Sequence, residues 1–390
     1  MSVIIVGYAR TPFVRYSGVF AGIPATALGA HAATAALKRA GIAGGDVDRV
    51  IVGQVLQGAA GQNPARQTAA GSGVPLTVPA VTVNVVCLSG LEAVQQAVRL
   101  IEAKEAQIVL AVGQESMTSA PHATRATRLG RRYGAIELID TMEHDGLTDA
   151  FEHVSMGSST EAGNAERGIR REEQDAWSAA SHQRAAAAVG VLAAEISPYE
   201  IAGRSGSVTV SSDDGVRSET TADVLARLRP AFAGDGTITA GNSAQLTDGA
   251  AAIVLMDEAV AAERGVTGIA RVVAHATVAG PDVKLHAQPA NAIRAALQKT
   301  DLAVGDLETI EINEAFAAVS VYSANMLAVD PAIVNPHGGA IALGHPIGAS
   351  GTRIVGHAAA SLHAAGPGKY GAAAICGGGG QGATIILQSI

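Results

Sequence analysis

The sequence predicts a layered α/β protein built from two similar halves, and two observations carry this prediction. Short apolar runs typical of buried strands alternate with helical stretches at both ends of the chain. Charged side chains gather in the middle, because 29 of the 62 Asp, Glu, Lys and Arg residues lie within residues 121–230. We therefore expect cores at both ends and a solvated excursion between them.

The first end of the chain predicts four buried strands, each a short run rich in Val and Ile. Two stretches between them have the apolar spacing of helices, and Gly41 supplies a residue suited to end the first of these. The expected strands are residues 3–6, 50–55, 81–86 and 107–113, and the expected helices are residues 25–40 and 90–103.

The charged middle predicts a surface helix that begins at Arg171 and ends near Val189. The last third then repeats the alternation of the first end. Its expected strands are residues 270–276, 309–312, 333–334 and 372–375, and its expected helices are residues 290–299, 315–327 and 350–364. Local similarity supports a duplication: Val83-Asn84 precedes Cys87 and a helix, and Val334-Asn335 precedes His345 and a helix.

Composition limits the function. The chain has 390 residues, 48% of them hydrophobic, which is enough for two or three domains of about 100–200 residues each. A net charge of −8 gives no general reason to bind nucleic acid or an anionic membrane surface. No apolar run approaches the roughly 20 residues of a spanning helix. Met1 leads directly into a short apolar run without a basic start, so we expect a cytoplasmic protein.

Two cysteines and one histidine are the candidate reactive groups. Cys87 and Cys376 are the only cysteines, and each follows an apolar run and lies beside glycine. His345 lies in a similar glycine-rich setting. Each alone has an ordinary interpretation, since cysteine is often a small core residue and many histidines are structural donors. We expect no disulfide framework, and the absence of HExxH, CxxC and Walker-type patterns predicts no metal and no nucleotide-phosphate loop.

Five segments, in order along the chain, resemble the motifs of the thiolase family, and the match reaches nearly end to end. They are Cys87-Leu88-Ser89-Gly90; Thr239-Ala240-Gly241-Asn242 with Asp248-Gly249-Ala250; Asn313-Glu314-Ala315-Phe316-Ala317; Gly344-His345-Pro346-Ile347-Gly348-Ala349-Ser350-Gly351; and Cys376 with glycines 377–380. The resemblance implies a thiolase-like, duplicated five-layered α/β/α fold with an inserted loop domain, assembled as a homodimer or homotetramer. On that plan, residues 1–117 with 248–268 form the first half, residues 118–247 the loop domain and residues 269–390 the second half.

The resemblance also implies the chemistry, which is acyl transfer between CoA thioesters. Cys87 would take an acetyl group from acetyl-CoA, and a position at a helix N-terminus would favour its thiolate. His345 would accept its proton, and Cys376 would deprotonate a second acetyl-CoA to give acetoacetyl-CoA and CoA. Asn313 would hold a water beside the enolate oxygen, and the backbone N–H groups of Cys87 and Gly378 would form an oxyanion hole. CoA is thus a substrate, and no cofactor is expected.

Residues for substrate binding follow from the same resemblance. Arg217 matches an arginine that lies against adenine, and the apolar residues expected at the coenzyme or acyl chain are Leu147, Met156, Phe232 and Phe316. Three positions depart from the biosynthetic pattern of the family and border the substrate pocket. They are Ser155 where histidine is typical, Ala244 where a pantetheine-contacting serine is typical, and Leu285-His286 where Met-Gly is common.

Other functions stay open at this point. The departures leave room for a degradative 3-ketoacyl-CoA thiolase with longer acyl substrates. A decarboxylating ketosynthase is disfavoured, because its enolate arises by loss of carbon dioxide and needs no base at Cys376. A non-catalytic CoA-binding scaffold subunit is a third alternative, against which the four intact residues Cys87, Asn313, His345 and Cys376 argue.

Overall fold

The computed structural model describes residues 2–203 and 206–390, and its centre is one ten-stranded sheet. The strands follow the order β12-β13-β14-β11-β1-β10-β5-β3-β4, and the short β2 pairs with β10. Their bounds are β1 (Val3–Arg10), β2 (Val14–Arg15), β3 (Arg49–Gly53), β4 (Ala80–Val83), β5 (Ile108–Ser116), β10 (Thr247–Asp257), β11 (Ala270–Ala279), β12 (Leu307–Ile312), β13 (Tyr370–Gly377) and β14 (Gln381–Ser389).

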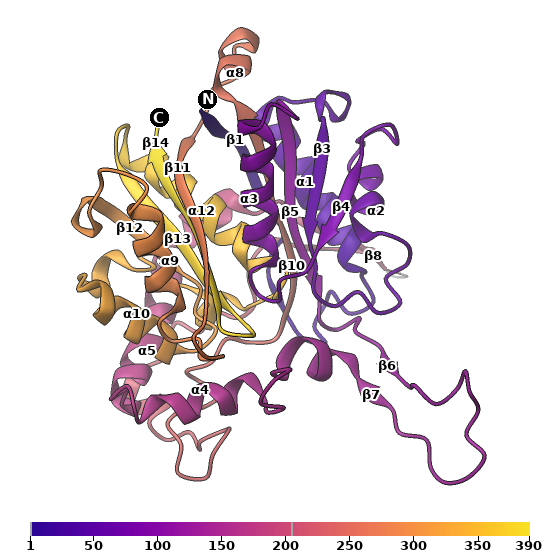
Figure 1. Ribbon diagram of the computed structural model, residues 1–390, viewed down its shortest axis with the longest axis vertical. Coiled ribbons are helices and arrows are strands. Elements are labelled where there is room, and N and C mark those ends of the chain that lie inside the picture. The colour runs from indigo at the N-terminus through magenta and orange to yellow at the C-terminus, as the bar shows by residue number, and fades with distance from the viewer. Residues whose placement is uncertain (1, 204–205) are drawn as a thin grey trace.

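Helices cover the outer faces of this sheet and also lie between its two halves (Figure 1). Their bounds are α1 (Ala25–Ala40), α2 (Pro64–Gly71), α3 (Ser89–Glu102), α4 (Met156–Asn164), α5 (Arg171–Ala187), α6 (Val189–Glu195), α7 (Ala222–Leu225), α8 (Glu258–Arg264), α9 (Gln288–Leu297), α10 (Ala317–Leu327), α11 (Ala340–Leu343) and α12 (Ser350–Ala365). Two small hairpins complete the described elements: β6 (His122–Ala123) with β7 (Ile139–Asp140), and β8 (Tyr199–Gly203) with β9 (Gly206–Val210).

The sheet consists of two halves joined by a short antiparallel pairing of β1 with β11, over residues 3–5 and 270–272. Helices α1 and α2 pack on the outer face of the first half, and α9 and α10 on the outer face of the second. Helices α3 and α12 lie between the two halves and contact each other. These are the five layers that the resemblance implies, and the fold class is confirmed.

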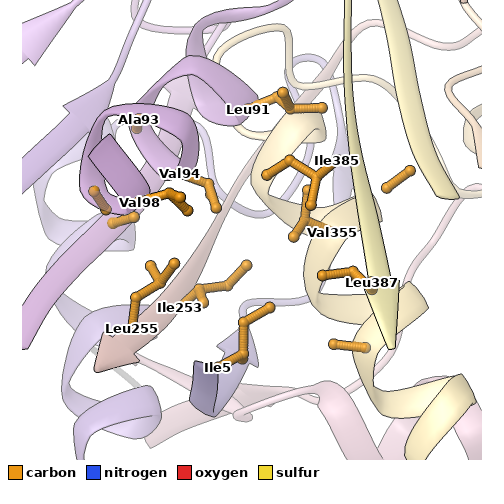
Figure 2. Packing of buried hydrophobic residues seen from close by; sticks show 14 of the residues in the cluster. Ile5, Leu91, Ala93, Val94, Val98, Ile253, Leu255, Val355, Ile385 and Leu387 are labelled. Atoms are coloured by element: carbon orange, nitrogen blue, oxygen red, sulfur yellow. The ribbon is translucent and has the colours of Figure 1, made fainter. Parts of the chain in front are cut away.

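The middle layer holds one continuous apolar core. Val94 of α3 points toward Ile253 of β10, Leu91 of α3 points toward Ile385 of β14, and Val355 of α12 lies beside Ile385 (Figure 2). All of them are fully buried. At the crossing of the two helices, a Cβ on Gly90 would lie 2.8 Å from Oγ1 of Thr352, so only glycine permits this approach. The two helices are thereby fixed at short distance, and both begin next to the segments that carry Cys87 and His345.

The expected elements at both ends of the chain are largely present. Helix α1 has the predicted bounds, and Gly41 ends it in the left-handed conformation with φ 67°. The strand expected at residues 333–334 is wrong: Pro331–Ile333 form a 3₁₀ turn, and Val334 makes a single bridge to Ile310. Proline has no N–H for a ladder, so the segment cannot extend into a strand on that side.

Two long strands, β10 and β14, are absent from the sequence-based expectations. Both are central in the sheet, and β10 is buried along all eleven residues. The described part of residues 118–247 supplies α4 to α7 and both hairpins, with α4 and α5 crossing below the second half in Figure 1. The division of the chain at residues 117, 247 and 268 stays a prediction. Within residues 2–203 and 206–390, no helix combines the length and apolarity needed to span a membrane.

Candidate active site

One cavity of about 730 Å³ brings the three candidate reactive side chains together. Cys87 comes from the first half of the fold, and His345 and Cys376 come from the second. All three line the same cavity although 289 positions separate the two cysteines in the sequence. The cavity therefore exists only because the two halves dock as they do.

Cys87 lies in a tight turn between β4 and α3. The residue before it, Val86, has φ 51°, which is an unfavourable conformation for a β-branched side chain. Ser89 stabilises the turn, since its hydroxyl donates to Val86 O at 2.6 Å and accepts from Val85 N at 2.9 Å. Such local strain is typical of functional sites because the surrounding structure must maintain it.

The environment of Cys87 favours the neutral thiol. Burial raises the pKa of Cys87 to about 11, and the charge of Glu115 acts in the same direction. The backbone N–H groups of Gly378 and of Cys87 itself act against this and stabilise the thiolate. The backbone N–H groups at this turn thus favour the thiolate, as expected of a helix N-terminus, but desolvation outweighs them.

His345 is held by four contacts in the loop before α12. Its backbone N–H lies 3.0 Å from Gln245 O and 3.2 Å from Oγ1 of Thr247, and its Nδ1 lies 2.6 Å from Oγ of Ser350. The amide nitrogen of Asn313 lies 3.4 Å from Nδ1 and 3.5 Å from Nε2. Burial, assisted by the positive charge of Arg353, lowers the pKa of His345 to about 4. The imidazole is therefore neutral at pH 7 and able to accept a proton.

Cys376 and Asn313 occupy the second half of the site. Cys376 is the penultimate residue of β13, fully buried and paired with Gly382 of β14. Burial raises its pKa further than that of Cys87. Asn313 follows β12, and its buried Oδ1 has no hydrogen-bond partner among the described residues. Asn313 is not among the residues that line the cavity, but its side chain lies beside His345, which does line it. An unpaired buried carbonyl oxygen there is suited to hold a water or a polar substrate atom.

All six residues expected at the substrate line the cavity. They are Leu147, Met156, Arg217, Phe232, Ala244 and Phe316. Ala244 is one of the three departing positions, and the other two reach the cavity through Ser155 and Leu285. His286 lies behind the wall, with Nε2 2.9 Å from Oδ1 of Asn164. Gly378 is near the cavity through its backbone, and its missing side chain leaves van der Waals room toward Val86 and Met156.

Two residues at the site are missing from the sequence-based candidates. Ser350 contacts His345 directly, and its position in the Gly344–Gly351 motif was an available signal. Glu115 is a fully buried acid at the end of the apolar strand β5. An acid buried within a strand is unusual enough to signal a function. Among residues 2–203 and 206–390, no group of three His, Cys, Asp or Glu side chains is placed to hold a metal ion.

Comparison with protein families decides the relationship. The model of the thiolase N-terminal domain matches residues 3–259, and that of the thiolase C-terminal domain matches residues 266–389. The chain belongs to the thiolase family. This thiolase is 49% identical to a protein named "Probable acetyl-CoA acetyltransferase" from Mycobacterium tuberculosis, over 100% of this chain and 99% of the relative. It is 44% identical to an acetyl-CoA acetyltransferase from Shinella zoogloeoides, over 99% of both chains.

Solved structures of thiolases have the same fold throughout. The acetyl-CoA acetyltransferase of Bacillus anthracis superimposes with a TM-score of 0.96 at 35% identity, covering 100% of this thiolase and 99% of that chain. Human mitochondrial 3-ketoacyl-CoA thiolase superimposes with a TM-score of 0.95 at 37% identity and the same coverage. The fold therefore does not distinguish between these two activities.

Proposed function

We propose that this thiolase is an acetyl-CoA C-acetyltransferase, which joins two acetyl-CoA into acetoacetyl-CoA and CoA or runs the reverse thiolysis. The observation that carries the proposal is the meeting of Cys87, His345 and Cys376 in one cavity. Relatives of the full length named acetyl-CoA acetyltransferase, at 43–49% identity, support this substrate.

In the first stage, the sulfur of Cys87 attacks the thioester carbon of acetyl-CoA while the thiol proton passes to His345. Proton transfer must accompany the attack, because the resting thiol and imidazole are both neutral. The backbone N–H groups of Cys87 and Gly378 stabilise the negative charge that develops on the acyl oxygen. Cleavage of the carbon–sulfur bond to CoA then leaves acetyl-Cys87 and a CoA thiolate.

The leaving thiolate prepares the second base. Cys376 can act as a base only after losing its own proton, and the departing CoA thiolate accepts it. His345 then carries the proton from Cys87, so it can donate to the enolate oxygen of the second acetyl-CoA. Asn313 assists through a water bound at its unpaired Oδ1.

In the second stage, Cys376 removes a proton from the methyl group of the second acetyl-CoA. The resulting enolate carbon attacks the acyl carbon of acetyl-Cys87, which forms the new carbon–carbon bond. The thiolate of Cys87 leaves and recovers its proton from His345. Every proton that moved is then accounted for, and the two cysteines have separate roles.

Substrate binding falls to the residues contributed by the middle of the chain. Arg217 is exposed at the cavity and suits the adenine nucleotide end of CoA, and Leu147, Met156 and Phe232 suit its pantetheine or the acyl group. Leu285, Phe316 and Met156 pack around Cys376, which limits the room for a long acyl chain there. Ala244 has no hydroxyl, so a contact of its side chain with pantetheine is apolar.

A degradative 3-ketoacyl-CoA thiolase is the second candidate, since Ser155 is smaller than the histidine typical of biosynthetic relatives and widens the cavity. Steady-state rates with a series of 3-ketoacyl-CoA substrates separate the two. We expect kcat/KM to be highest for acetoacetyl-CoA and to fall with each added pair of carbons. A maximum at a longer chain would favour the degradative enzyme. Assembly as a homodimer or homotetramer and a cytoplasmic location stay predictions.

The direct test is the acyl-enzyme. After mixing with acetyl-CoA, mass spectrometry should find one added acetyl group on the peptide that contains Cys87. Cys87→Ser should lose this adduct and both directions of turnover, because a hydroxyl is a much weaker nucleophile at neutral pH. Acetylation confined to another peptide would rule out Cys87 as the nucleophile. A scaffold subunit would show no adduct and no turnover.

A further inference from the structure

The carboxylate of Glu115 connects the two halves of the active site. It projects from the end of β5 and is fully buried. Its Oε2 accepts hydrogen bonds from the backbone N–H of Val55, at 3.0 Å, and of Gly348, at 2.9 Å, and its Oε1 accepts from Leu56 N at 3.2 Å. One oxygen atom thus joins a loop of the first half to the loop that carries His345.

Gly348 packs closely against Glu115 and the residue before it. A Cβ on Gly348 would lie 2.8 Å from Oε2 of Glu115 and 2.6 Å from Gln114 O. Gly348 lies three residues after His345 and directly after Ile347, which lines the cavity. A shift of Gly348 would therefore move the imidazole relative to Cys87.

The side chain also influences the nucleophile through its charge. The carboxylate is close enough to raise the pKa of Cys87. Burial, helped by the charge of Asp248, raises the pKa of Glu115 itself to about 7, while its three backbone donors favour the charged form. A carboxylate that makes the nucleophile less acidic is unfavourable for thiolate formation, so its presence needs another explanation. The hydrogen bonds to the two loops supply one.

We propose that Glu115 is a positioning residue for catalysis, which fixes the His345 loop against the Cys87 half of the site. The role rests on the proposed thiolase function. It gives Glu115 two separable effects: the hydrogen bonds accelerate turnover, and the negative charge restrains the reactivity of the thiol.

Two variants separate these effects. Glu115→Gln keeps the size but removes the charge, and its amide group cannot accept hydrogen bonds at both ends. We expect kcat to fall about 10²-fold, as for a misplacement near 1 Å, with little change in KM for acetyl-CoA. Alkylation of Cys87 by iodoacetamide at pH 7 should in contrast become about twofold faster or more, and its pH profile should move to lower pH. Glu115→Asp keeps the charge but is too short for all three donors, so it should slow turnover without moving the pH profile.

Ser116→Ala is the matched control, because Ser116 is the next buried residue of β5 and its side chain hydrogen-bonds to the hydroxyl of Ser119. It should leave kcat and the alkylation profile unchanged. Folded Glu115→Gln or Glu115→Asp with wild-type kcat would overturn the positioning role alone. If Glu115→Gln does not fold, Glu115→Asp decides by its kcat. A wild type that makes no acetoacetyl-CoA would overturn both this role and the proposed function.

Discussion

The hydroxyl of Ser350 lies 2.6 Å from Nδ1 of His345 and donates its own proton to Pro346 O, 3.0 Å away. With that proton engaged, the oxygen is placed to accept from the imidazole. Nδ1 of the neutral ring then carries the hydrogen, and Nε2, 3.5 Å from the amide nitrogen of Asn313, is the proton acceptor. A single hydroxyl thus selects the tautomer in which His345 can act as a base.

Ser350→Ala should lower kcat about tenfold, since it removes one hydrogen bond of roughly 1 to 1.5 kcal/mol and leaves the tautomer unselected. KM for acetyl-CoA should hardly change. Ser361→Ala on the same helix α12 is the control, because its side chain is remote from His345 in the hydrogen-bond network. Steady-state kinetics of both variants make the test, and equal kcat values for wild type and Ser350→Ala would contradict the tautomer argument.

The two thiols should differ in reactivity. Cys87 is partly exposed in the cavity and Cys376 is fully buried, and burial raises the pKa of Cys376 further. Substoichiometric iodoacetamide should therefore alkylate Cys87 first and abolish turnover, and acetyl-CoA should protect. The absolute rate should be slow at pH 7 and rise steeply toward pH 10, because the pKa of Cys87 is about 11. Peptide mass spectrometry identifies the labelled site, and earlier labelling of Cys376 would contradict the assignment.

Variants of Cys376 and His345 should be defective at different stages of the reaction. Cys376→Ala should still form acetyl-Cys87 but not condense it, whereas His345→Ala should impair both stages. Losing a general base costs about 10²–10⁴-fold and losing an oxyanion donor about 10²–10³-fold, so the size of the defect does not discriminate. Rapid quench of the acetyl-enzyme, with and without further acetyl-CoA, identifies the failing stage. Condensation by Cys376→Ala at the wild-type rate would leave Cys376 as a packing residue.

Stability should fall in mild acid because buried neutral histidines must gain a proton on unfolding. Burial lowers the pKa of His286 from the usual 6.5 to about 4. The unfolded chain therefore binds the proton first, and the stabilisation present above pH 6.5 is lost as the pH falls toward 4. His286 alone contributes roughly 3 kcal/mol, at about 1.4 kcal/mol for each unit of pKa difference.

Urea titrations at pH 7 and pH 4.5 measure this loss. His286→Gln should be less sensitive to acid than wild type, while replacement of the exposed His363 by Gln should not change the sensitivity. The argument fails if His286→Gln loses as much stability between the two pH values as the wild type does.

The positions of the reactive groups could be predicted from the sequence, whereas their pKa values could not. Glycines beside Cys87, His345 and Cys376 indicate turns at strand ends, and the structure brings all three to one cavity. The raised pKa of Cys87 could not be predicted, because the helix N-terminus is visible in the sequence whereas the extent of burial is a property of the assembled halves.

The missing strands have a similar explanation. The first residues of β10, Thr247-Asp248-Gly249-Ala250, have low strand propensity, and β14 follows a run of glycines. Both are held in the sheet by neighbours on either side, and that tertiary support cannot be seen in a local window. Glu115 was missed for the same reason, since its three donors come from segments about 60 and 233 residues away.

Helices α3 and α12 cross closely at Gly90 because this residue has no Cβ. The distance between the segments that carry Cys87 and His345 depends on this close contact. A methyl group at this crossing would push apart two helices that directly follow the segments carrying the nucleophile and its base. A change in the distance between α3 and α12 would therefore change the distance between the side chains of Cys87 and His345.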